Sequence, residues 1–96
     1  MPVKVKGYLT YKEIIGEQSI TIPKDAALTL SDLLTTLANQ LGQEFINLIF
    51  NPQFESLGEH VVVIVNGRSY RNLPDGLETS LQDGDEVAIF PPMAGG

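Results

Sequence analysis

Cysteine is absent from this chain of 96 residues, and histidine occurs once, as His60. Without a thiol, the chain forms no disulfide, offers no thiolate to a metal and has no cysteine nucleophile. If the protein handles sulfur, the sulfur is therefore held elsewhere than on a side-chain thiol. A single histidine does not make a histidine-rich metal site, and we expect His60 at the start of a strand.

Basic residues are also scarce. Six lysines and arginines stand against twelve acids, which gives a net charge of −6. Binding to nucleic acid rests on lysine and arginine side chains that neutralise phosphates, so nucleic acid is not an expected partner. An acidic chain can instead be steered toward a basic partner surface, and the same charge favours solubility.

Long apolar runs are missing as well. No stretch approaches the ~20 apolar residues of a membrane-spanning helix. The opening Met-Pro-Val-Lys leads directly into a strand pattern, which is not the pattern of a signal peptide. We therefore expect a cytoplasmic protein that has no membrane partner.

The length of the chain fits one hydrophobic core. A chain of this size hides roughly 60–65% of the surface that its unfolded form exposes, which suffices for one core and no second one. Apolar residues make up 43% of the sequence, so disorder over the whole length is not expected. We expect residues 1–90 to form a single domain and residues 91–96 to form an extended C-terminal tail.

Two strands and a turn are predicted near the N-terminus. Val3 and Val5 alternate with lysines, which is the period-two pattern of a half-buried strand. The run Ser19–Pro23 predicts a second strand that its proline ends. A turn around Gly16 joins the two strands, so we expect a hairpin.

One long helix is predicted next. Thr29 begins it, because a hydroxyl at this position caps free backbone amides and Asp32 follows at the third helical position. Gly42 ends it as the C-terminal cap. Leucines spaced by three, four and seven residues form one apolar stripe that we expect to pack against a sheet: Leu30, Leu33, Leu34, Leu37 and Leu41. Residues 43–60 predict a short helical turn followed by a loop.

Three strands are predicted in the last part of the chain. Residues 61–65 are the strongest strand, Asn66-Gly67 is a hairpin turn, and residues 68–70 return as a short strand. The last strand, residues 86–90, is very apolar for its length, so we place it centrally and parallel to the first strand. The order of elements predicts an α+β domain in which one main helix covers one face of a mixed sheet, the β-grasp or ubiquitin-like fold.

Side-chain chemistry is nearly absent from the sequence. No nucleophile stands beside a base, and neither a phosphate-binding loop nor a metal-ligand spacing occurs. Asp83, Asp85 and Glu86 lack the remaining ligands of a calcium loop and instead predict a turn around Gly84. We therefore expect no metal site, no bound cofactor and no enzyme that works through its own side chains.

The C-terminal carboxylate of Gly96 is the remaining reactive group. ATP can convert a carboxylate to an acyl-adenylate, and sulfur can then displace AMP to leave a thiocarboxylate. Gly95 and Gly96 lack a Cβ, so this backbone can pass through a narrow channel in another protein. Pro91 and Pro92 favour an extended exit from the domain. The ending therefore indicates a stalk that presents a reactive group.

The ending LQDGDEVAIFPPMAGG closely resembles the C-terminus of the small subunit of molybdopterin synthase, the MoaD family, to which the ThiS carriers are related. The VNGR turn and the helix from Thr29 also match, so the resemblance covers nearly the whole chain, and the length is similar to that of archaeal-type members. The resemblance implies a sulfur carrier that is not an enzyme on its own. A ubiquitin-activating-type enzyme would use ATP to adenylate Gly96, and a sulfur donor would then supply the sulfur of a thiocarboxylate.

The same resemblance implies a role for each residue of the tail. The thiocarboxylate on Gly96 would enter the large subunit of molybdopterin synthase and supply sulfur for the dithiolene, a step of molybdenum cofactor biosynthesis. Gly95 would be the passage residue. The inserted stalk would consist of Pro91, Pro92, Met93 and Ala94.

Other functions stay open at this point. A ubiquitin-like modifier would join Gly96 to target lysines, and a carrier for another pathway, such as tRNA thiolation, would use the same activated end. A passive binding module without covalent chemistry is a third class. Phe90 also has two interpretations, as an aromatic anchor for the large subunit or as an ordinary core residue.

Overall fold

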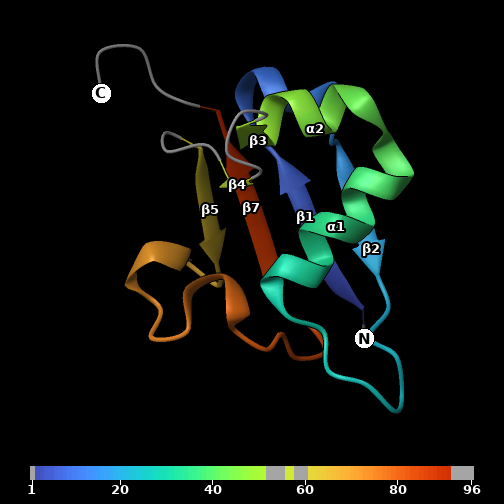
Figure 1. The fold of residues 1–96 in the computed structure, drawn as a ribbon, viewed down its shortest axis with the longest axis vertical. Coiled ribbons are helices and arrows are strands. Elements are labelled where there is room, and N and C mark those ends of the chain that lie inside the picture. Colours follow the sequence, from blue (N-terminus) through green and yellow to red (C-terminus); the bar gives the residue numbers. More distant parts are fainter. Residues whose placement is uncertain (1, 52–55, 58–60, 92–96) are drawn as a thin grey trace.

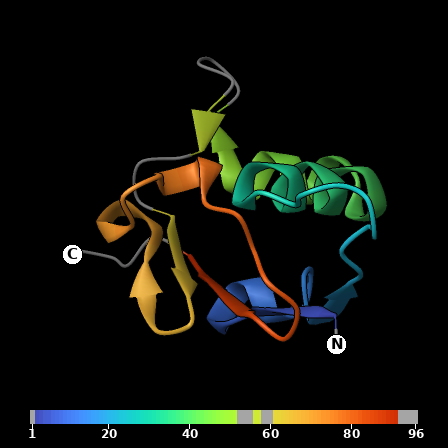
Figure 2. The same ribbon diagram turned by 90° about the horizontal axis from the view of Figure 1, so that it is seen from below.

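The computed structural model describes residues 2–51, 56–57 and 61–91. The main sheet consists of β1 (Val3–Gly7), β2 (Glu17–Ile20), β5 (Val62–Val65), β6 (Arg68–Ser69) and β7 (Glu86–Phe90). The helices α1 (Leu30–Leu41) and α2 (Gln43–Ile49) lie together on one face of this sheet (Figure 1). The view in Figure 2 shows the two layers, with the helices on one side and the strands on the other. The predicted α+β architecture is confirmed.

The parallel pair of β1 and β7 occupies the centre of the sheet, whose strand order is β2-β1-β7-β5-β6. The register places Val5 opposite Val87 and Gly7 opposite Ile89. On its other side β7 pairs antiparallel with β5, where Val63 lies opposite Ile89. The prediction of a central last strand that runs parallel to the first is therefore confirmed, and this topology is that of the β-grasp.

Strand β2 differs from its predicted range. The sequence predicts a strand over Ser19–Pro23, whereas β2 spans Glu17–Ile20. It pairs antiparallel with β1, and its last residue lies opposite Val3, the residue at which β1 begins. The backbone that follows β2 has therefore passed the start of its partner strand, and the ladder stops.

The connection between β1 and β2 is also longer than the predicted turn. A short 3₁₀ helix, η1 (Leu9–Lys12), precedes the turn at Gly16, whose φ of +57° is the left-handed conformation that favours glycine. Tyr11 and Ile15 are buried in this connection. It packs so closely on β1 that a Cβ added to Gly7 would lie 2.7 Å from the Cβ of Ile15 and from the backbone oxygen of Tyr11.

Helix α1 begins at the predicted cap. The hydroxyl of Thr29 accepts a hydrogen bond from the Asp32 amide, and the Asp32 carboxylate accepts one from the Thr29 amide, both at 3.1 Å. This reciprocal pair satisfies two backbone amides at the start of the helix. The helix ends before Gly42, whose φ is +83°. Four leucines of the predicted stripe are buried, and Leu41 is partly buried against the core.

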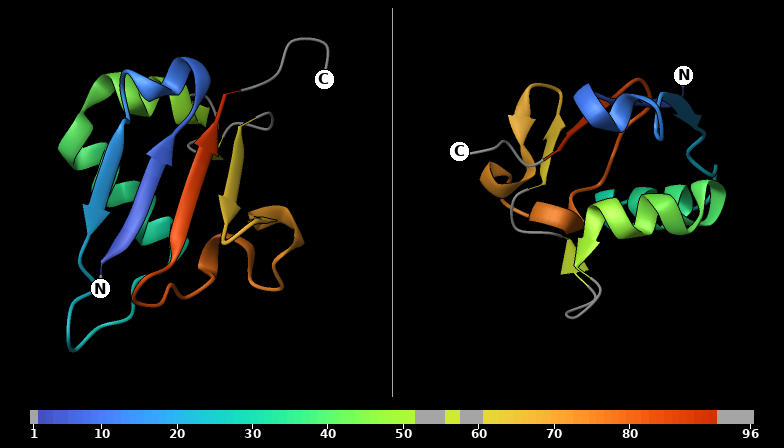
Figure 3. Two further views of the ribbon diagram at one scale, coloured as in Figure 1. Left: turned by 180° about the vertical axis from the view of Figure 1, so that it is seen from behind. Right: turned by 90° about the horizontal axis from the view of Figure 1, so that it is seen from above.

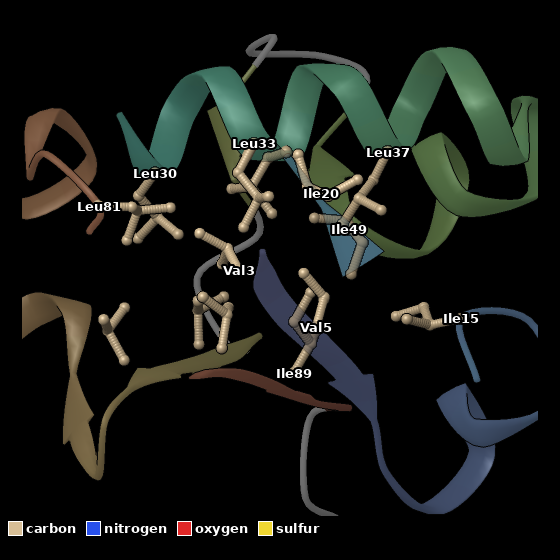
Figure 4. Close-up of a cluster of buried hydrophobic side chains, with 14 of the residues drawn as sticks. Val3, Val5, Ile15, Ile20, Leu30, Leu33, Leu37, Ile49, Leu81 and Ile89 are labelled. Atoms are coloured by element: carbon tan, nitrogen blue, oxygen red, sulfur yellow. The ribbon is translucent and has the colours of Figure 1, made fainter. Parts of the chain in front are cut away.

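The hydrophobic core lies between the helices and the sheet (Figure 4). Side chains of α1 point down toward those of β1, β2 and β7, and Ile15 and Ile49 lie beside them. The largest fully buried side chains include Phe45, Ile15, Leu30, Leu33, Leu34, Leu37, Ile49 and Ile89. Among the residues that the structure describes, no polar or charged residue is buried. The described part of the core is therefore built from hydrophobic side chains.

Residues 43–60 contain more regular structure than predicted. Helix α2 is followed by β3 (Phe50–Asn51) and β4 (Ser56–Leu57), which pair antiparallel. The sequence does not predict this ribbon, because strands of two residues are too short to show a period. His60, expected at the start of a strand, lies outside the described residues.

The predicted hairpin between β5 and β6 is confirmed. Asn66 and Gly67 have φ values of +50° and +86°, as a two-residue turn of this kind requires. β6 is shorter than predicted, because Tyr70 begins the 3₁₀ helix η2 (Tyr70–Asn72). A further 3₁₀ helix, η3 (Gly76–Glu78), lies in the turn-rich stretch before β7. Within residues 2–51, 56–57 and 61–91, no helix has the length and apolar character that crossing a bilayer requires.

Candidate functional site at the root of the tail

Most of the predicted reactive tail lies outside the described residues. These residues are Pro92, Met93, Ala94, Gly95 and Gly96. The structure describes the root from which the tail leaves, namely Phe90 at the end of β7 and Pro91, which is buried. The tail therefore begins at the central strand of the sheet, and its first proline packs against the domain.

Phe90 lies on the open face of the sheet, which we define as the face that carries the outward side chains of β1, β5 and β7. Figure 3 (left) shows this face in front and the helices behind the sheet. The half-buried ring of Phe90 stacks on the ring of Tyr8, with 4.6 Å between ring centroids and an interplanar angle of 9°. The Tyr8 amide donates a hydrogen bond of 3.0 Å to the carbonyl oxygen of Ile89. This bond extends the parallel ladder past β1 and keeps the two rings side by side.

Tyr8 was not among the predicted site residues. The predicted parallel pairing contains the signal that identifies it, because residues that follow paired positions on parallel strands become neighbours. Gly7 pairs with Ile89, so Tyr8 is the neighbour of Phe90. Sequence reasoning placed the two strands correctly but did not extend their register to the side chains on the open face.

Lys6 connects the aromatic pair to β2. Its Nζ lies 5.5 Å from the centroid of the Tyr8 ring, within the range of a cation–π contact. The same ammonium lies 3.6 Å from Oε1 of Glu17. Both members of this ion pair are at least half exposed, so it contributes little to stability. Its consequence is local, since it holds a positive charge over the ring next to the root of the tail.

A hollow of about 490 Å³ lies in the open face. The sheet register places Ala88 of β7 between Lys6 of β1 and Ile64 of β5. Along β7 itself, the outward neighbours of Ala88 are Glu86 and Phe90, because alternate residues share a face. A small side chain thus stands among four larger ones in this hollow, whose lining extends from β2 across β1 and β7 to β5.

The VNGR and DGDEV motifs meet at the other end of β7. Nδ2 of Asn66 donates to Oδ1 of Asp85, and the amide of Glu86 donates to Oδ1 of Asn66, both at 2.9 Å. Oδ2 of Asp85 accepts a bond of 2.8 Å from the Gln82 amide. Asp85 therefore fixes the turn that starts β7, and the predicted turn around Gly84, with its φ of +85°, is confirmed.

Metal ligands are not gathered in the part of the chain that the structure describes. There, no group of three or more histidine, cysteine, aspartate or glutamate residues could hold an ion. Asp85 uses both carboxylate oxygens for the hydrogen bonds of the turn.

Comparison with known proteins identifies the family. The ThiS family model matches residues 8–96, which is nearly the whole chain and includes the tail. The chain belongs to the ThiS family. The resemblance to MoaD and ThiS carriers that the sequence indicates is thereby confirmed, and small carriers of the ThiS and MoaD type are generally not catalysts themselves.

Relatives of this ThiS-family chain include modifiers and a molybdopterin factor. Small archaeal modifier protein 3 of Haloferax volcanii is 35% identical over 96 residues, which are 100% of both chains. The crystal structure of SAMP1 from Haloferax volcanii has a TM-score of 0.74 at 25% identity, over 100% of each chain. The putative molybdopterin converting factor subunit 1 from Pyrococcus furiosus has a TM-score of 0.69 at 26% identity, over 97% of this chain and 99% of that one. The chain is thus a ubiquitin-like member of the small archaeal modifier and sulfur-carrier group.

Proposed function

We propose that this chain is a sulfur carrier whose C-terminal Gly96 is adenylated and then converted to a thiocarboxylate. The observation that supports this most strongly is the ThiS family match, which runs through residue 96 and so includes both terminal glycines. The alignment with a relative that is 35% identical also extends over all 96 residues and so includes the tail. The absence of cysteine agrees with sulfur that is held on a carboxyl group.

The proposed chemistry takes place in an activating enzyme of the ubiquitin-activating type, in the cytoplasm. A carboxylate oxygen of Gly96 bonds to the α-phosphorus of ATP, and pyrophosphate leaves. A sulfur nucleophile from a donor then bonds to the carbonyl carbon, and AMP leaves with the oxygen that joined it to the acyl group. The carrier supplies the carbonyl group and its delivery, while the enzyme binds ATP.

The root of the tail limits where such an enzyme can bind. A segment of five residues, the length of 92–96, spans at most about 18 Å when fully extended. The reacting centre of any partner must therefore come within this distance of Pro91, and the body of the partner must approach the end of β7. Phe90 is the proposed anchor there, because its half-buried ring is held by Tyr8 directly before the tail.

We further propose that the thiocarboxylate serves molybdopterin synthesis. The carrier would be the small subunit of molybdopterin synthase, and two charged carriers would supply the two dithiolene sulfurs as cyclic pyranopterin monophosphate becomes molybdopterin. The similarity to the putative molybdopterin converting factor subunit 1 supports this acceptor. Under the proposal, the catalytic bases and the pterin site belong to the large subunit.

Protein modification is the second candidate. The similarity to small archaeal modifier proteins 3 and 1 supports it. In this function, the ε-amino group of a target lysine bonds to the activated carbonyl carbon of Gly96 and the activating group leaves, which produces an isopeptide bond. Both functions need the same first step, the adenylation of Gly96.

Two experiments test the proposal. The first measures pyrophosphate release when the carrier is mixed with its activating enzyme and ATP. Gly96→Ala should slow release sharply, since displacement of a reacting group by ~1 Å costs about a hundredfold in rate, and a residue added after Gly96 should abolish it. Ala27→Gly, which removes a methyl group at an exposed loop position outside the tail, is the control and should release pyrophosphate as fast as the native chain. Equal release from the extended and the native chain would refute the proposal.

The second experiment separates the two fates of the activated end. Purified carrier, activating enzyme, sulfur donor, large subunit and pterin precursor should together yield molybdopterin if the first fate is correct. Modification is read from cell protein by mass spectrometry. No lysine or arginine follows Arg71, so trypsin leaves residues 72–96 attached to a modified lysine. If lysine-containing peptides carry this remnant and the reconstituted mixture yields no molybdopterin, the result favours protein modification as the function.

A further inference from the structure

One asparagine of the chain stands directly before a glycine. The sequence has asparagine at positions 39, 47, 51, 66 and 72, and of these only Asn66 is followed by glycine, Gly67. An asparagine before glycine is prone to deamidation, because the next backbone nitrogen can attack the side-chain carbonyl carbon and glycine has no side chain to obstruct that attack. Asn66 and Gly67 are both exposed, so water and base can reach them.

The structure holds the Asn66 side chain against the segment that begins β7. Its Nδ2 donates to Oδ1 of Asp85, and its Oδ1 accepts from the amide of Glu86, both at 2.9 Å. The Asn66 amide also donates a bond of 2.8 Å to the carbonyl oxygen of Glu86. We call these three bonds the Asn66 clamp. Because both ends of the carboxamide are bonded, the side chain must leave its partners before its Cγ can turn to the nitrogen of Gly67.

The chemistry needs only water and a base. The nitrogen of Gly67 loses its proton to the base and bonds to Cγ of Asn66. The bond from Cγ to Nδ2 breaks, Nδ2 takes up a proton and leaves as ammonia, and a succinimide ring remains. Water then opens the ring at one of its two carbonyl carbons. One opening gives aspartate, and the other gives isoaspartate, in which the main chain runs through the former side chain.

We propose that Asn66 is a deamidation site which the Asn66 clamp holds back, and that its conversion to a carboxylate loosens the start of β7. The inference concerns the chemical lifetime of the folded chain and does not depend on sulfur transfer. A hydrogen bond from an amide to a charged carboxylate favours the held side chain by about tenfold. Asp85 is therefore the member of the clamp whose removal should free Asn66 most.

The product of the reaction does not fit the clamp. A carboxylate at position 66 can still accept from the amide of Glu86, but the oxygen in place of Nδ2 would lie 2.9 Å from Oδ1 of Asp85. Two negative groups at this distance repel one another. Asp85 also accepts from the Gln82 amide through Oδ2 and from the Lys4 amide through its carbonyl oxygen. The repulsion therefore acts where β7 enters the sheet beside β1.

The rate of deamidation in the full chain tests the clamp. The chain is incubated folded and, separately, in guanidinium chloride above its unfolding transition. Trypsin then releases residues 25–68 and 72–96, which together contain all five asparagines, and mass spectrometry of their fragments locates the new acid. In denaturant, Asn66 should react first. In the folded wild type it should react at least tenfold more slowly than in denaturant, and folded Asp85→Ala should raise that rate about tenfold.

Gly7→Ala is the control for a general loss of stability. It strains the packing of β1 on Ile15 and leaves the clamp intact, so the folded variant should keep the wild-type rate at Asn66. An equal increase in Gly7→Ala and Asp85→Ala would show that the reaction follows global unfolding and would overturn the inference. Equal rates in the folded and the denatured wild type, an unchanged rate in folded Asp85→Ala, or another asparagine that reacts first in denaturant would overturn it as well.

Variants that mimic the product decide the matter if Asp85→Ala does not fold. Asn66→Asp should lower the melting temperature by about 4–8 °C. Adding Asp85→Asn should restore it, because the new amide donates to the carboxylate at position 66 while its oxygen still accepts from Gln82. Asp85→Asn alone should gain no stability, since its amide nitrogen then faces another donor. An Asn66→Asp chain as stable as the wild type, or one that Asp85→Asn does not rescue, would overturn the inference.

Discussion

The stacked rings of Tyr8 and Phe90 predict a measurable energetic coupling at the root of the tail. A fully buried phenylalanine costs ~3–5 kcal/mol when truncated to alanine. Phe90 is half-buried, so Phe90→Ala should lower the free energy of unfolding by about 2 kcal/mol, which lowers the melting temperature by roughly 10 °C in a domain of this size. Rings at 4.6 Å and 9° should account for ~0.5–1.5 kcal/mol of this loss.

A double-mutant cycle isolates this coupling. Urea unfolding of the wild type, Tyr8→Ala, Phe90→Ala and the double variant gives four free energies, compared at equal m-values. The loss in the double variant should fall short of the summed single losses by about 1 kcal/mol. Tyr8→Phe keeps the ring and should preserve the coupling. If the two single losses add up to the loss in the double variant within ~0.3 kcal/mol, the two rings are not energetically coupled and the prediction is wrong.

Three further predictions concern the fold and the tail. Gly7→Ala should destabilise the domain by about 1–3 kcal/mol in urea unfolding, because the new methyl meets the Cβ of Ile15 at 2.7 Å; an unchanged midpoint would contradict the close packing. Burial raises the pKa of Tyr11 above its ordinary value of 10.0, so its contribution to stability is complete below that pH and is lost as the pH rises through the folded pKa. Tyr11→Phe should therefore flatten the fall in melting temperature above about pH 10, and an equally steep fall would exclude Tyr11 as its cause. Deleting Gly95 and Gly96 should leave thermal unfolding nearly unchanged while it abolishes thiocarboxylate formation; a large drop in melting temperature would show that the tail is structural.

Local signals predicted the helical layer well. The capping box of α1 involves residues three positions apart, and the leucine stripe lies within one helix, so both can be read without knowledge of the rest of the chain. The turn residues Asn66, Gly67 and Gly84 are predictable for the same reason, since asparagine and glycine tolerate the positive φ that each of these positions adopts. Where one segment determines its own conformation, the sequence of that segment was sufficient to predict it.

Features that depend on a partner segment were predicted less well. The end of β2 is set by where β1 begins, so the pattern in Ser19–Pro23 alone does not reveal it. The ribbon of β3 and β4 forms between strands of two residues each. At the candidate site, Phe90 was identified from its place before the prolines. The stack of Tyr8 on Phe90 and the position of Ala88 between Lys6 and Ile64 follow from the register of three strands, so they appear only when that register is known.

The central claim is that the carbonyl group of Gly96 receives sulfur. Intact mass spectrometry of the chain incubated with its own activating enzyme, ATP and a sulfur donor tests this claim most directly. The account predicts a mass increase that corresponds to one oxygen replaced by sulfur, located in the C-terminal fragment, and no increase in the chain that lacks Gly95 and Gly96. An unchanged mass for the native chain, with an enzyme shown to consume ATP on another carrier, would contradict it.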